Sequence, residues 1–539
     1  MSQTTWIQIG KFVPVACLTL VSALAQTSPA NEWGTLSAQA IEAFSRGSYA
    51  ESERLHSSAL AIAEKLGPSD DRLAASLSNM GTVYRAQGRY ADAEKLYRRA
   101  LELREGNFGA AHPEVAVVVN NLATLYHAEG RTAEAEPLFR RALAIWEQSP
   151  GQEDRRLAAA LNNLAGIYRA SGRFAEADGL YHRALELFQK VFGPEDANVA
   201  LVLSNLGVLY QNEGKYQTAA QLHSRALAIR ERALGPDHPD VAAALSNLAD
   251  VYRSQWRMAE AQPLYERALS IREKTLGPNH EQIAETLSSL AVLYKTQERY
   301  TEAEQLSRRA LAIVEKTLGS EHPRVAVALN NLGQTAAAQG KYADAKRLYQ
   351  QAIAIWEKAL GPDHLDVASG LINLASLYHT RHKYAEAEGL YQKALRIQEH
   401  HLGPMNATVA MNLNNLATVA YARHVYGEAE ELYRKSIAML EETQGPDMPG
   451  LADPLLNLGA LYFAEHRFSE AAPLFKRALP LRETALGAFH PKLAEAIEHY
   501  VMVLRKLEDY AEAERLQARA TGIRVRAALR AESARGNRV

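Results

Sequence analysis

The feature that most constrains this chain is a sequence pattern that returns every 42 residues. Asparagine marks one position of the pattern nine times, and only Ser289 and His499 interrupt that register: Asn79, Asn121, Asn163, Asn205, Asn247, Asn331, Asn373, Asn415 and Asn457. A fixed period of this length is typical of repeat proteins, in which each unit is one supersecondary element that packs against its neighbours. The 539 residues are therefore expected to form one elongated array rather than several independent globular domains.

The sequence of each repeat predicts two helices. Apolar residues such as Val241, Leu245, Leu248 and Tyr252 recur at three- and four-residue steps, which indicates a helix with one apolar face. A short turn that usually contains glycine follows, and then a second helix that ends at Leu-Gly-Pro, where proline prevents continuation. A single hairpin cannot bury both apolar faces, so the pattern predicts an all-α solenoid of stacked antiparallel helix hairpins.

Two positions of the repeat hold only small residues. One is alanine in every copy from Ala93 to Ala513, and the position of Ala249 is glycine or alanine from Gly81 to Gly459. A larger side chain at a tight helix crossing costs about 1–3 kcal/mol. The helices of each pair are therefore expected to cross closely at these positions.

The small and aromatic residues of the unit resemble the signature of the tetratricopeptide repeat, as in Ala249, Tyr252, Ala261, Tyr265 and Ala268. The linker "LGPDHPDVA" and the phrase "NNLA" resemble the kinesin light chain type of that repeat. The resemblance implies a right-handed superhelix of about twelve helix pairs over residues 36–523, with the first helices lining a concave groove for protein partners. No heptad pattern accompanies the repeats, so attachment to a motor is not expected.

The N-terminus resembles an export signal. Lys11 is followed by the apolar run "FVPVACLTLVSALA" and by the small-residue site Ala23-Leu24-Ala25. The run is short for a membrane span, so residues 1–25 are expected to be a signal peptide cleaved after Ala25, residues 26–35 a linker, and the mature chain periplasmic or secreted, without an integral membrane segment. Cleavage itself is not determined by the sequence. It would remove Cys17, the only cysteine, and with it any thiol chemistry or disulfide.

The charge of the whole chain does not favour nucleic acid as a partner. The formal net charge is −2, which gives no reason to expect binding to nucleic acid. The segment 524–539 is rich in arginine and is interpreted as a basic, solvated C-terminal tail.

The asparagine register has two interpretations. Each amide could hydrogen-bond the adjacent repeat and so satisfy buried groups along the stack. Alternatively, the amides could line the concave groove and bind the backbone of an extended peptide, because a primary amide both donates and accepts. For a single asparagine the sequence favours neither interpretation over the other, whereas the row as a whole favours peptide binding.

Specificity is expected from the position six residues beyond each asparagine, near the end of the same helix. The candidates are Arg85, Arg169, Gln211, Arg253, Lys295 and Tyr421, with His127, His379 and Phe463 at the same position. Cations could pair with acidic side chains and rings could stack. The partner is accordingly expected to be an acidic or aromatic peptide, although each of these residues alone could be an ordinary surface residue.

The histidines do not predict a metal centre. His112, His238, His280, His322, His364 and His490 share one linker position and would lie a full repeat apart, too far to share a zinc ion. They are interpreted as helix-start residues, and His382, His424 and His466 as replacements for a glycine in the left-handed region. With no catalytic motif, the chain is expected not to be an enzyme and to need no cofactor.

Two functions remain. The chain is either an exported adaptor that binds extended peptide segments of partner proteins in its concave groove, or a structural scaffold that assembles through its convex face or ends. Self-association is possible in the second case, and there the asparagines only stabilise the stack.

Overall fold

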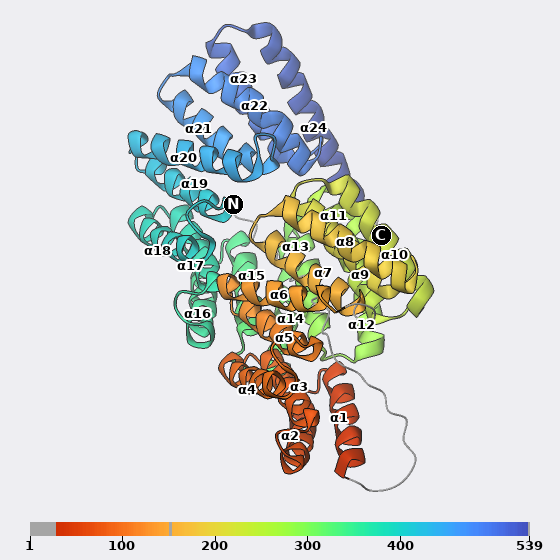
Figure 1. The fold of residues 1–539 in the computed structure, drawn as a ribbon. Helices are drawn as coiled ribbons and strands as arrows, with labels where there is room; N and C mark the ends of the chain where they lie inside the picture. The colour runs from red at the N-terminus through yellow and green to blue at the C-terminus, as the bar shows by residue number, and fades with distance from the viewer. Residues whose placement is uncertain (1–28, 150–153, 537–539) are drawn as a thin grey trace.

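A computed structural model describes residues 29–149 and 154–536, and these form helices joined by short turns. The odd-numbered helices are the first of each pair: α1 (Pro29–Ser45), α3 (Asp71–Ala86), α5 (Pro113–Ala128), α7 (Asp154–Ala170), α9 (Ala197–Asn212), α11 (Pro239–Ser254), α13 (Glu281–Thr296), α15 (Pro323–Ala338), α17 (Leu365–Thr380), α19 (Ala407–Ala422), α21 (Ala452–Ala464, preceded by the 3-10 turn Pro449–Leu451) and α23 (Pro491–Lys506). The even-numbered helices are the second: α2 (Tyr49–Leu66), α4 (Tyr90–Phe108), α6 (Thr132–Glu147), α8 (Phe174–Phe192), α10 (Tyr216–Leu234), α12 (Met258–Leu276), α14 (Tyr300–Leu318), α16 (Tyr342–Leu360), α18 (Tyr384–Leu402), α20 (Tyr426–Gln444), α22 (Phe468–Leu486) and α24 (Tyr510–Gly536). The predicted all-α solenoid of stacked antiparallel hairpins is confirmed (Figure 1).

The ends of the array differ from the expected boundaries. Helix α1 begins at Pro29, inside the segment expected to be a linker. Helix α24 continues to Gly536, so most of the segment 524–539 extends the last helix. Its alanine, arginine and leucine residues are strong helix formers, and no proline interrupts them. The expected signal peptide lies outside the described residues.

The repeated histidines begin first helices, as expected. Each accepts a hydrogen bond at Nδ1 from the backbone N–H two residues later, as in His322 to Arg324 at 3.1 Å. Asp70, Asp196 and Asn406 do the same with a side-chain oxygen. Such caps satisfy N–H groups that have no partner inside the helix, which explains why the linker ends in a side chain with an acceptor.

The two small-residue positions lie at close helix crossings. The alanine register is fully buried, as at Ala93, Ala261 and Ala429. At the other position, a Cβ atom on Gly333 would lie only 2.7 Å from the ring of Tyr349 in the paired helix. The small residues therefore permit the aromatic ring to pack against the helix backbone.

On the outer side, an arginine immediately before several of the second helices links neighbouring repeats. The guanidinium of Arg131 lies 3.8 Å from the ring centre of Tyr126 and pairs with Glu94 of the preceding repeat at 3.0 Å and with Glu134 at 2.7 Å. The same arrangement recurs at Arg173 and Arg467. Networks of this kind stabilise more than isolated surface pairs do.

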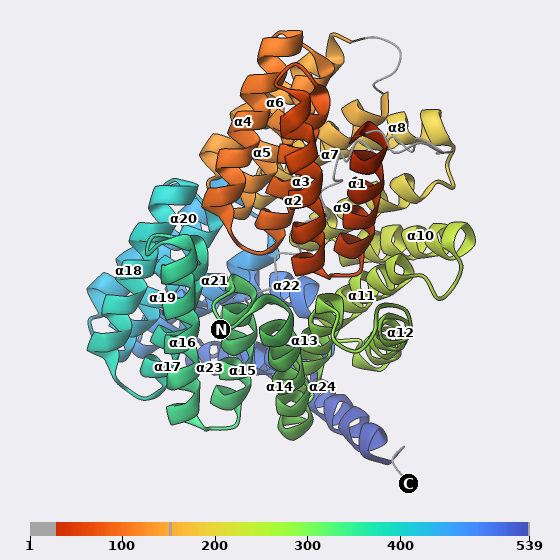
Figure 2. The same ribbon diagram turned by 90° about the horizontal axis from the view of Figure 1, so that it is seen from below.

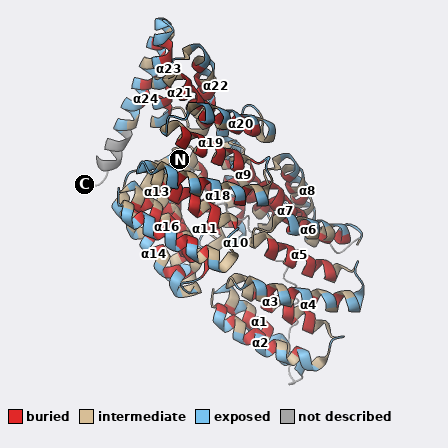
Figure 3. Ribbon diagram, turned by 90° about the vertical axis from the view of Figure 1, so that its left-hand side faces the viewer, coloured by how far each residue is buried: buried red, intermediate tan, exposed pale blue. Residues whose placement is uncertain are grey.

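First helices form the inner wall of the superhelix. Neighbouring first helices contact one another, as α9 and α13 both do with α11, and no neighbouring second helices do so to the same extent among the described elements. Figure 3 shows α5 buried along most of its length. The concave side is therefore built from the helices that carry the asparagine register.

The superhelix turns tightly enough for distant repeats to meet. The hydroxyl of Tyr49 in α2 donates to the carboxylate of Glu281 in α13 at 2.9 Å, across 232 residues of sequence. Figure 2 shows the end of the first hairpin beside α13. One superhelical turn thus takes about five and a half repeats of 42 residues.

A candidate binding surface on the concave wall

The asparagine register lies where neighbouring first helices meet. Asn163, Asn205 and Asn373 are buried, and the others are half-buried: Asn79, Asn121, Asn247, Asn331, Asn415 and Asn457. The asparagines thus differ in burial, although they occupy the same position of the sequence repeat.

Four amides bond directly to the preceding repeat. Asn163 donates to the side-chain oxygen of Asn120 at 3.2 Å, and equivalent bonds join Asn205 to Asn162 (2.7 Å), Asn373 to Asn330 (2.9 Å) and Asn457 to Asn414 (3.0 Å). In each case the acceptor lies 43 residues upstream, one position before the register of the previous repeat. These four amides satisfy one another inside the stack, as buried polar groups must.

The other five amides have no such bond. Forty-three residues before them the chain carries Ser78, Ser204, Ser288 or Ile372, or, for Asn79, a residue of α1. Asn79, Asn121, Asn247 and Asn415 form no side-chain hydrogen bond within the described residues, and the buried amide nitrogen of Asn331 also has no partner there. A register amide therefore forms a hydrogen bond within the stack only where the residue 43 positions upstream is an asparagine.

Sequence reasoning missed this position. The signal was present, because the repeats that supply an acceptor contain two consecutive asparagines, as in Asn120-Asn121 and Asn414-Asn415. The register alone could not show that the residue before it faces the following repeat.

Two basic candidates, each six residues beyond a register position, lie in neighbouring repeats in the middle of the concave wall. Arg253 donates to Asp250 at 3.1 Å and to the hydroxyl of Tyr265 at 3.4 Å. Lys295, in the next repeat, donates to Gln334 at 2.8 Å. Burial and then the nearby charge of Arg253 lower the pKa of Lys295 to about 8.

Another cation of this register lies two repeats before Arg253. Arg169 is buried. Burial, followed by the charge of Arg169, lowers the pKa of His127 to about 4. His127 is therefore neutral at physiological pH, and Arg169 supplies the charge at this point of the wall.

The remaining candidates differ in how available they are. The side chain of Arg85 is half-buried and forms no hydrogen bond or ion pair within the described residues. Gln211 donates to Ser254 of the next repeat at 3.2 Å. Tyr421 is half-buried, with its ring centre 5.8 Å from that of Tyr426. Asn79 with Arg85 and Asn415 with Tyr421 are thus the pairs that the stack leaves unused.

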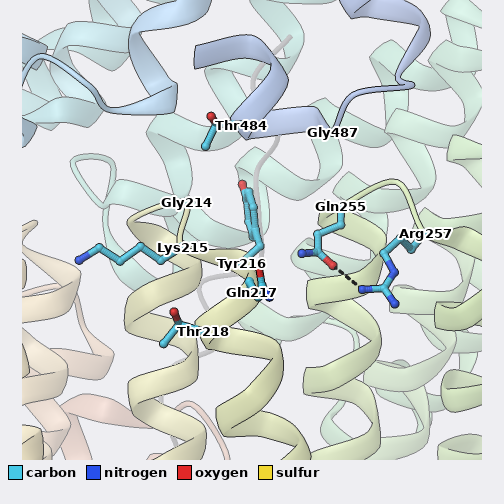
Figure 4. Close-up of a pocket in the computed structure, with 9 residues that line it drawn as sticks. All are labelled: Gly214, Lys215, Tyr216, Gln217, Thr218, Gln255, Arg257, Thr484 and Gly487. Carbon is cyan, nitrogen blue, oxygen red and sulfur yellow. Dashed lines mark hydrogen bonds between the residues drawn. The ribbon is translucent and has the colours of Figure 1, made fainter. Parts of the chain in front are cut away.

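A cavity of about 570 Å³ lies away from this wall, between two superhelical turns. Figure 4 shows Tyr216, Gln255 and Arg257 on one side and Thr484 with Gly487 on the other. Its lining contains no carboxylate, imidazole or register asparagine. Among the described residues, no group of three or more His, Cys, Asp or Glu side chains is placed to hold a metal ion, and no described helix is long and apolar enough to cross a bilayer.

The chain belongs to the tetratricopeptide repeat family. The family model described as "Tetratricopeptide repeat" matches residues 35–106, 72–148, 156–231, 198–257, 240–316, 282–358, 324–400, 408–484 and 452–524. Solenoids of this kind present extended binding surfaces to other proteins, and the chain is a protein-interaction scaffold of this type.

Solved structures with similar folds include kinesin light chain-like repeat proteins. BtubC (BKLC) from P. vanneervenii is 30% identical, with 47% of this chain and 94% of that chain covered and a TM-score of 0.35. A putative kinesin light chain with nearly identical TPR-like repeats from Podospora anserina is 29% identical, with 38% and 98% covered and a TM-score of 0.33. Yeast Tom70 is 14% identical, with 91% and 96% covered and a TM-score of 0.43. No curated protein matches the chain in sequence.

Proposed function

We propose that this protein is an exported adaptor whose concave wall binds extended, acidic or aromatic segments of partner proteins. The observation that carries the proposal is the division of the asparagine register. Asn79, Asn121, Asn247 and Asn415 are half-buried on the inner wall and make no bond to the stack. Amides that the fold does not use remain able to donate to and accept from a peptide backbone.

The charges on the wall support an acidic ligand. Arg85 has no carboxylate partner among the residues that the structure describes, and Lys295 bonds to a neutral amide rather than to an acid. An arginine or lysine on a partly desolvated wall pairs more strongly with a carboxylate than it would on an open surface. Tyr421 adds a ring near the far end of the wall, where an aromatic side chain could stack.

A comparison of two variants tests the groove. The first carries Asn79→Ala, Asn121→Ala, Asn247→Ala and Asn415→Ala; its control carries Asn163→Ala, Asn205→Ala, Asn373→Ala and Asn457→Ala. Peptides selected on the wild-type chain from a displayed random library supply the ligand, and binding and thermal unfolding are measured for both variants.

Under the proposal, the first variant loses binding by tenfold or more and melts like the wild type, since it removes only unused amides. The control melts lower, because each change removes a hydrogen bond worth about 0.5–1.5 kcal/mol. If the first variant keeps full affinity, the concave amides are not the binding surface.

The alternative is a structural scaffold that assembles through its convex face or ends. The four amide bonds between repeats favour this role for the asparagines that form them. A wild-type chain that selects no peptide but changes its oligomeric state with concentration in analytical ultracentrifugation would support this alternative.

Export is tested separately. Expression of the full chain in a Gram-negative bacterium, followed by fractionation and N-terminal sequencing, is expected to give an extracytoplasmic protein that begins at Gln26. A protein that retains Met1 in the cytoplasmic fraction would contradict export.

A further inference from the structure

A line of contacts joins the first turn of the superhelix to the second. At each contact, the turn between the two helices of one repeat meets the linker residue that starts a first helix six repeats later. The pairs are Gly47 with His280, Gly88 with His322, Gly130 with His364, Gly214 with Pro449, and Trp256 with His490. Their residue numbers differ by 233 to 235, so the contacts follow one seam along the molecule.

The approach at the seam is too close for most side chains. A Cβ atom on Gly88 would lie 3.1 Å from the imidazole of His322, and one on Gly130 would lie 2.9 Å from that of His364. Both glycines have a positive φ, which other residues adopt at a cost. Trp256 is the exception, and its ring centre lies 4.1 Å from that of His490.

The equivalent turns of the last six repeats face no further superhelical turn, and they rarely use glycine. At the same positive-φ position they carry Glu298, His382, His424, His466 and Glu508, and only Gly340 keeps the glycine. Four of the five glycines at this position in the first six repeats therefore face a residue across the seam, whereas a Cβ atom on the fifth, Gly172, would have nothing within 4 Å.

The linker histidines are also different inside and outside the seam. His280, His322, His364 and His490 are each less than a tenth exposed. His112 and His238 cap their helices in the same way but are half-exposed. Contact with the earlier turn accounts for this difference.

Both ring nitrogens of His322 have a contact in the neutral form. In His322, Nδ1 accepts the helix-capping hydrogen bond at 3.1 Å, and Nε2 lies 3.3 Å from the carbonyl oxygen of Ala86 across the seam. The ring of His280 faces the backbone of Ser45. The Nε2 atom of His364 is buried beside Gly130 and has no hydrogen-bond partner within the described residues. Only the tautomer with the proton on Nε2 satisfies both contacts of His322. A second proton on Nδ1 would face a backbone N–H and place a charge in a buried site.

We propose that these four histidines form an acid-labile clasp. While they are neutral they hold the two turns of the superhelix together, and when they are protonated they release the turns and lengthen the molecule without unfolding the repeats. The hairpins persist because each is held by its sequence neighbours. This inference does not depend on the concave wall being the binding surface.

The charges that face each histidine set where the clasp opens. Burial lowers the pKa of His322 and of His490 to about 4, assisted by Arg324 on the same helix in the first case and by Lys492 and Arg482 in the second. Burial also lowers the pKa of His280 and of His364. Glu281 and Glu285 act against this shift at His280 while Arg272 adds to it, and Asp366 acts against it at His364 while His401 adds to it.

The stability of the seam is expected to fall as the pH is lowered. The folded pKa values lie below the ordinary value near 6.5, so the seam is fully stabilised above about pH 6.5 and weakens as the pH falls towards 4. Opening is therefore expected within that interval.

The test is small-angle X-ray scattering of the full chain from pH 7.5 to 4, with circular dichroism on the same samples. The radius of gyration is expected to rise by a fifth or more below pH 6.5 while the helical signal stays constant. A constant radius, or a rise that occurs only together with loss of helix, would overturn the proposal.

The chain itself supplies a matched control. Asn406 occupies the same helix-capping position of its repeat, is buried, accepts from the N–H of Thr408 at 2.8 Å, and does not titrate in this range. The variant His280→Asn, His322→Asn, His364→Asn, His490→Asn is expected to lose the pH-dependent change, whereas His112→Asn with His238→Asn is expected to retain it. A fourfold variant that expands with acid as the wild type does would overturn the clasp; one already extended at pH 7.5 would support it, since the histidines alone would then hold the turns.

A second variant opens the seam without acid. Gly88→Asn and Gly130→Asn keep a residue that tolerates positive φ but add side-chain atoms against His322 and His364. The radius of gyration at pH 7.5 is expected to match that of the wild type at acid pH. A helical, compact variant would show that the seam does not set the length of the molecule.

Discussion

The imidazole Nε2 of His322 lies 3.3 Å from the carbonyl oxygen of Ala86, a residue 236 positions earlier in the chain. The contact joins two helices that share no neighbouring repeat, and it depends on Gly88 having no side chain. A repeat array whose stability is otherwise the sum of nearest-neighbour interfaces thereby gains contacts between distant repeats. We expect wild-type unfolding to be more cooperative at pH 7.5 than at pH 5, where the seam is weaker.

A glycine that faces a ring should not tolerate alanine. In Gly333→Ala the new Cβ atom would lie 2.7 Å from the ring of Tyr349, and the free energy of unfolding should fall by about 1–3 kcal/mol. Gly389→Ala is the control, because it is exposed on α18 with nothing within 4 Å of the new atom, and it should gain about 0.4–1 kcal/mol. Chemical denaturation measures both changes; equal effects would mean that the Gly333 crossing is looser than described.

Replacement of His223 should make the protein more stable and less sensitive to acid. This side chain is fully buried, neither ring nitrogen has a hydrogen-bond partner in the described part of the chain, and burial followed by the charge of Arg230 lowers its pKa to about 3. Other repeats place Tyr or Phe there, as in Phe475 opposite Gly459. His223→Phe removes unsatisfied polar groups and should gain about 1–3 kcal/mol at pH 7.

The pH dependence follows from the same shift. Because the folded pKa of His223 lies below the unfolded value near 6.5, the wild type loses stability as the pH falls from 6.5 towards 3, and His223→Phe should lose less over this range. Urea midpoints at pH 7, 6 and 5 measure the difference. Parallel midpoints for the two proteins would exclude His223 as a source of acid sensitivity.

Lys295 should titrate unusually low for a lysine, at about 8. Arg253→Gln removes the neighbouring cation and should raise that pKa, while burial keeps it below the ordinary value. The side-chain ¹³Cε shift of labelled lysine follows the titration, and Lys295→Arg identifies the resonance. An unchanged titration in Arg253→Gln would show that the two cations do not interact along the wall.

The dependence of the amide hydrogen bonds on an upstream asparagine can be tested by adding one such acceptor. Ser204 occupies the position that would accept from Asn247, as Asn162 accepts from Asn205 at 2.7 Å. Ser204→Asn should form this bond and gain about 0.5–1.5 kcal/mol. The gain should vanish when Asn247→Ala is also present; a gain that persists would have another origin.

Part of the candidate site followed from the sequence and part did not. The register placed all nine asparagines on the first helices, but the structure shows that Asn163 and Asn205 are bonded within the stack while Asn79 and Asn121 are not. The difference depends on the residue 43 positions upstream, which a helix pattern does not connect with the amide. Arg169 likewise looked accessible by position but is buried, and Arg85 at the equivalent position is not.

The sequence by itself determined the helices, their caps, their order and the stacking of hairpins, because these depend on interactions within one helix turn or between adjacent repeats. Only the tertiary structure decided which repeats meet across the superhelix. The small rotation between neighbouring repeats accumulates until the turn at Gly88 reaches His322, and no local pattern records that sum. The linker histidines show both kinds of determination. Their helix capping follows from their position in the repeat, whereas their burial in the seam follows from the pitch of the whole array.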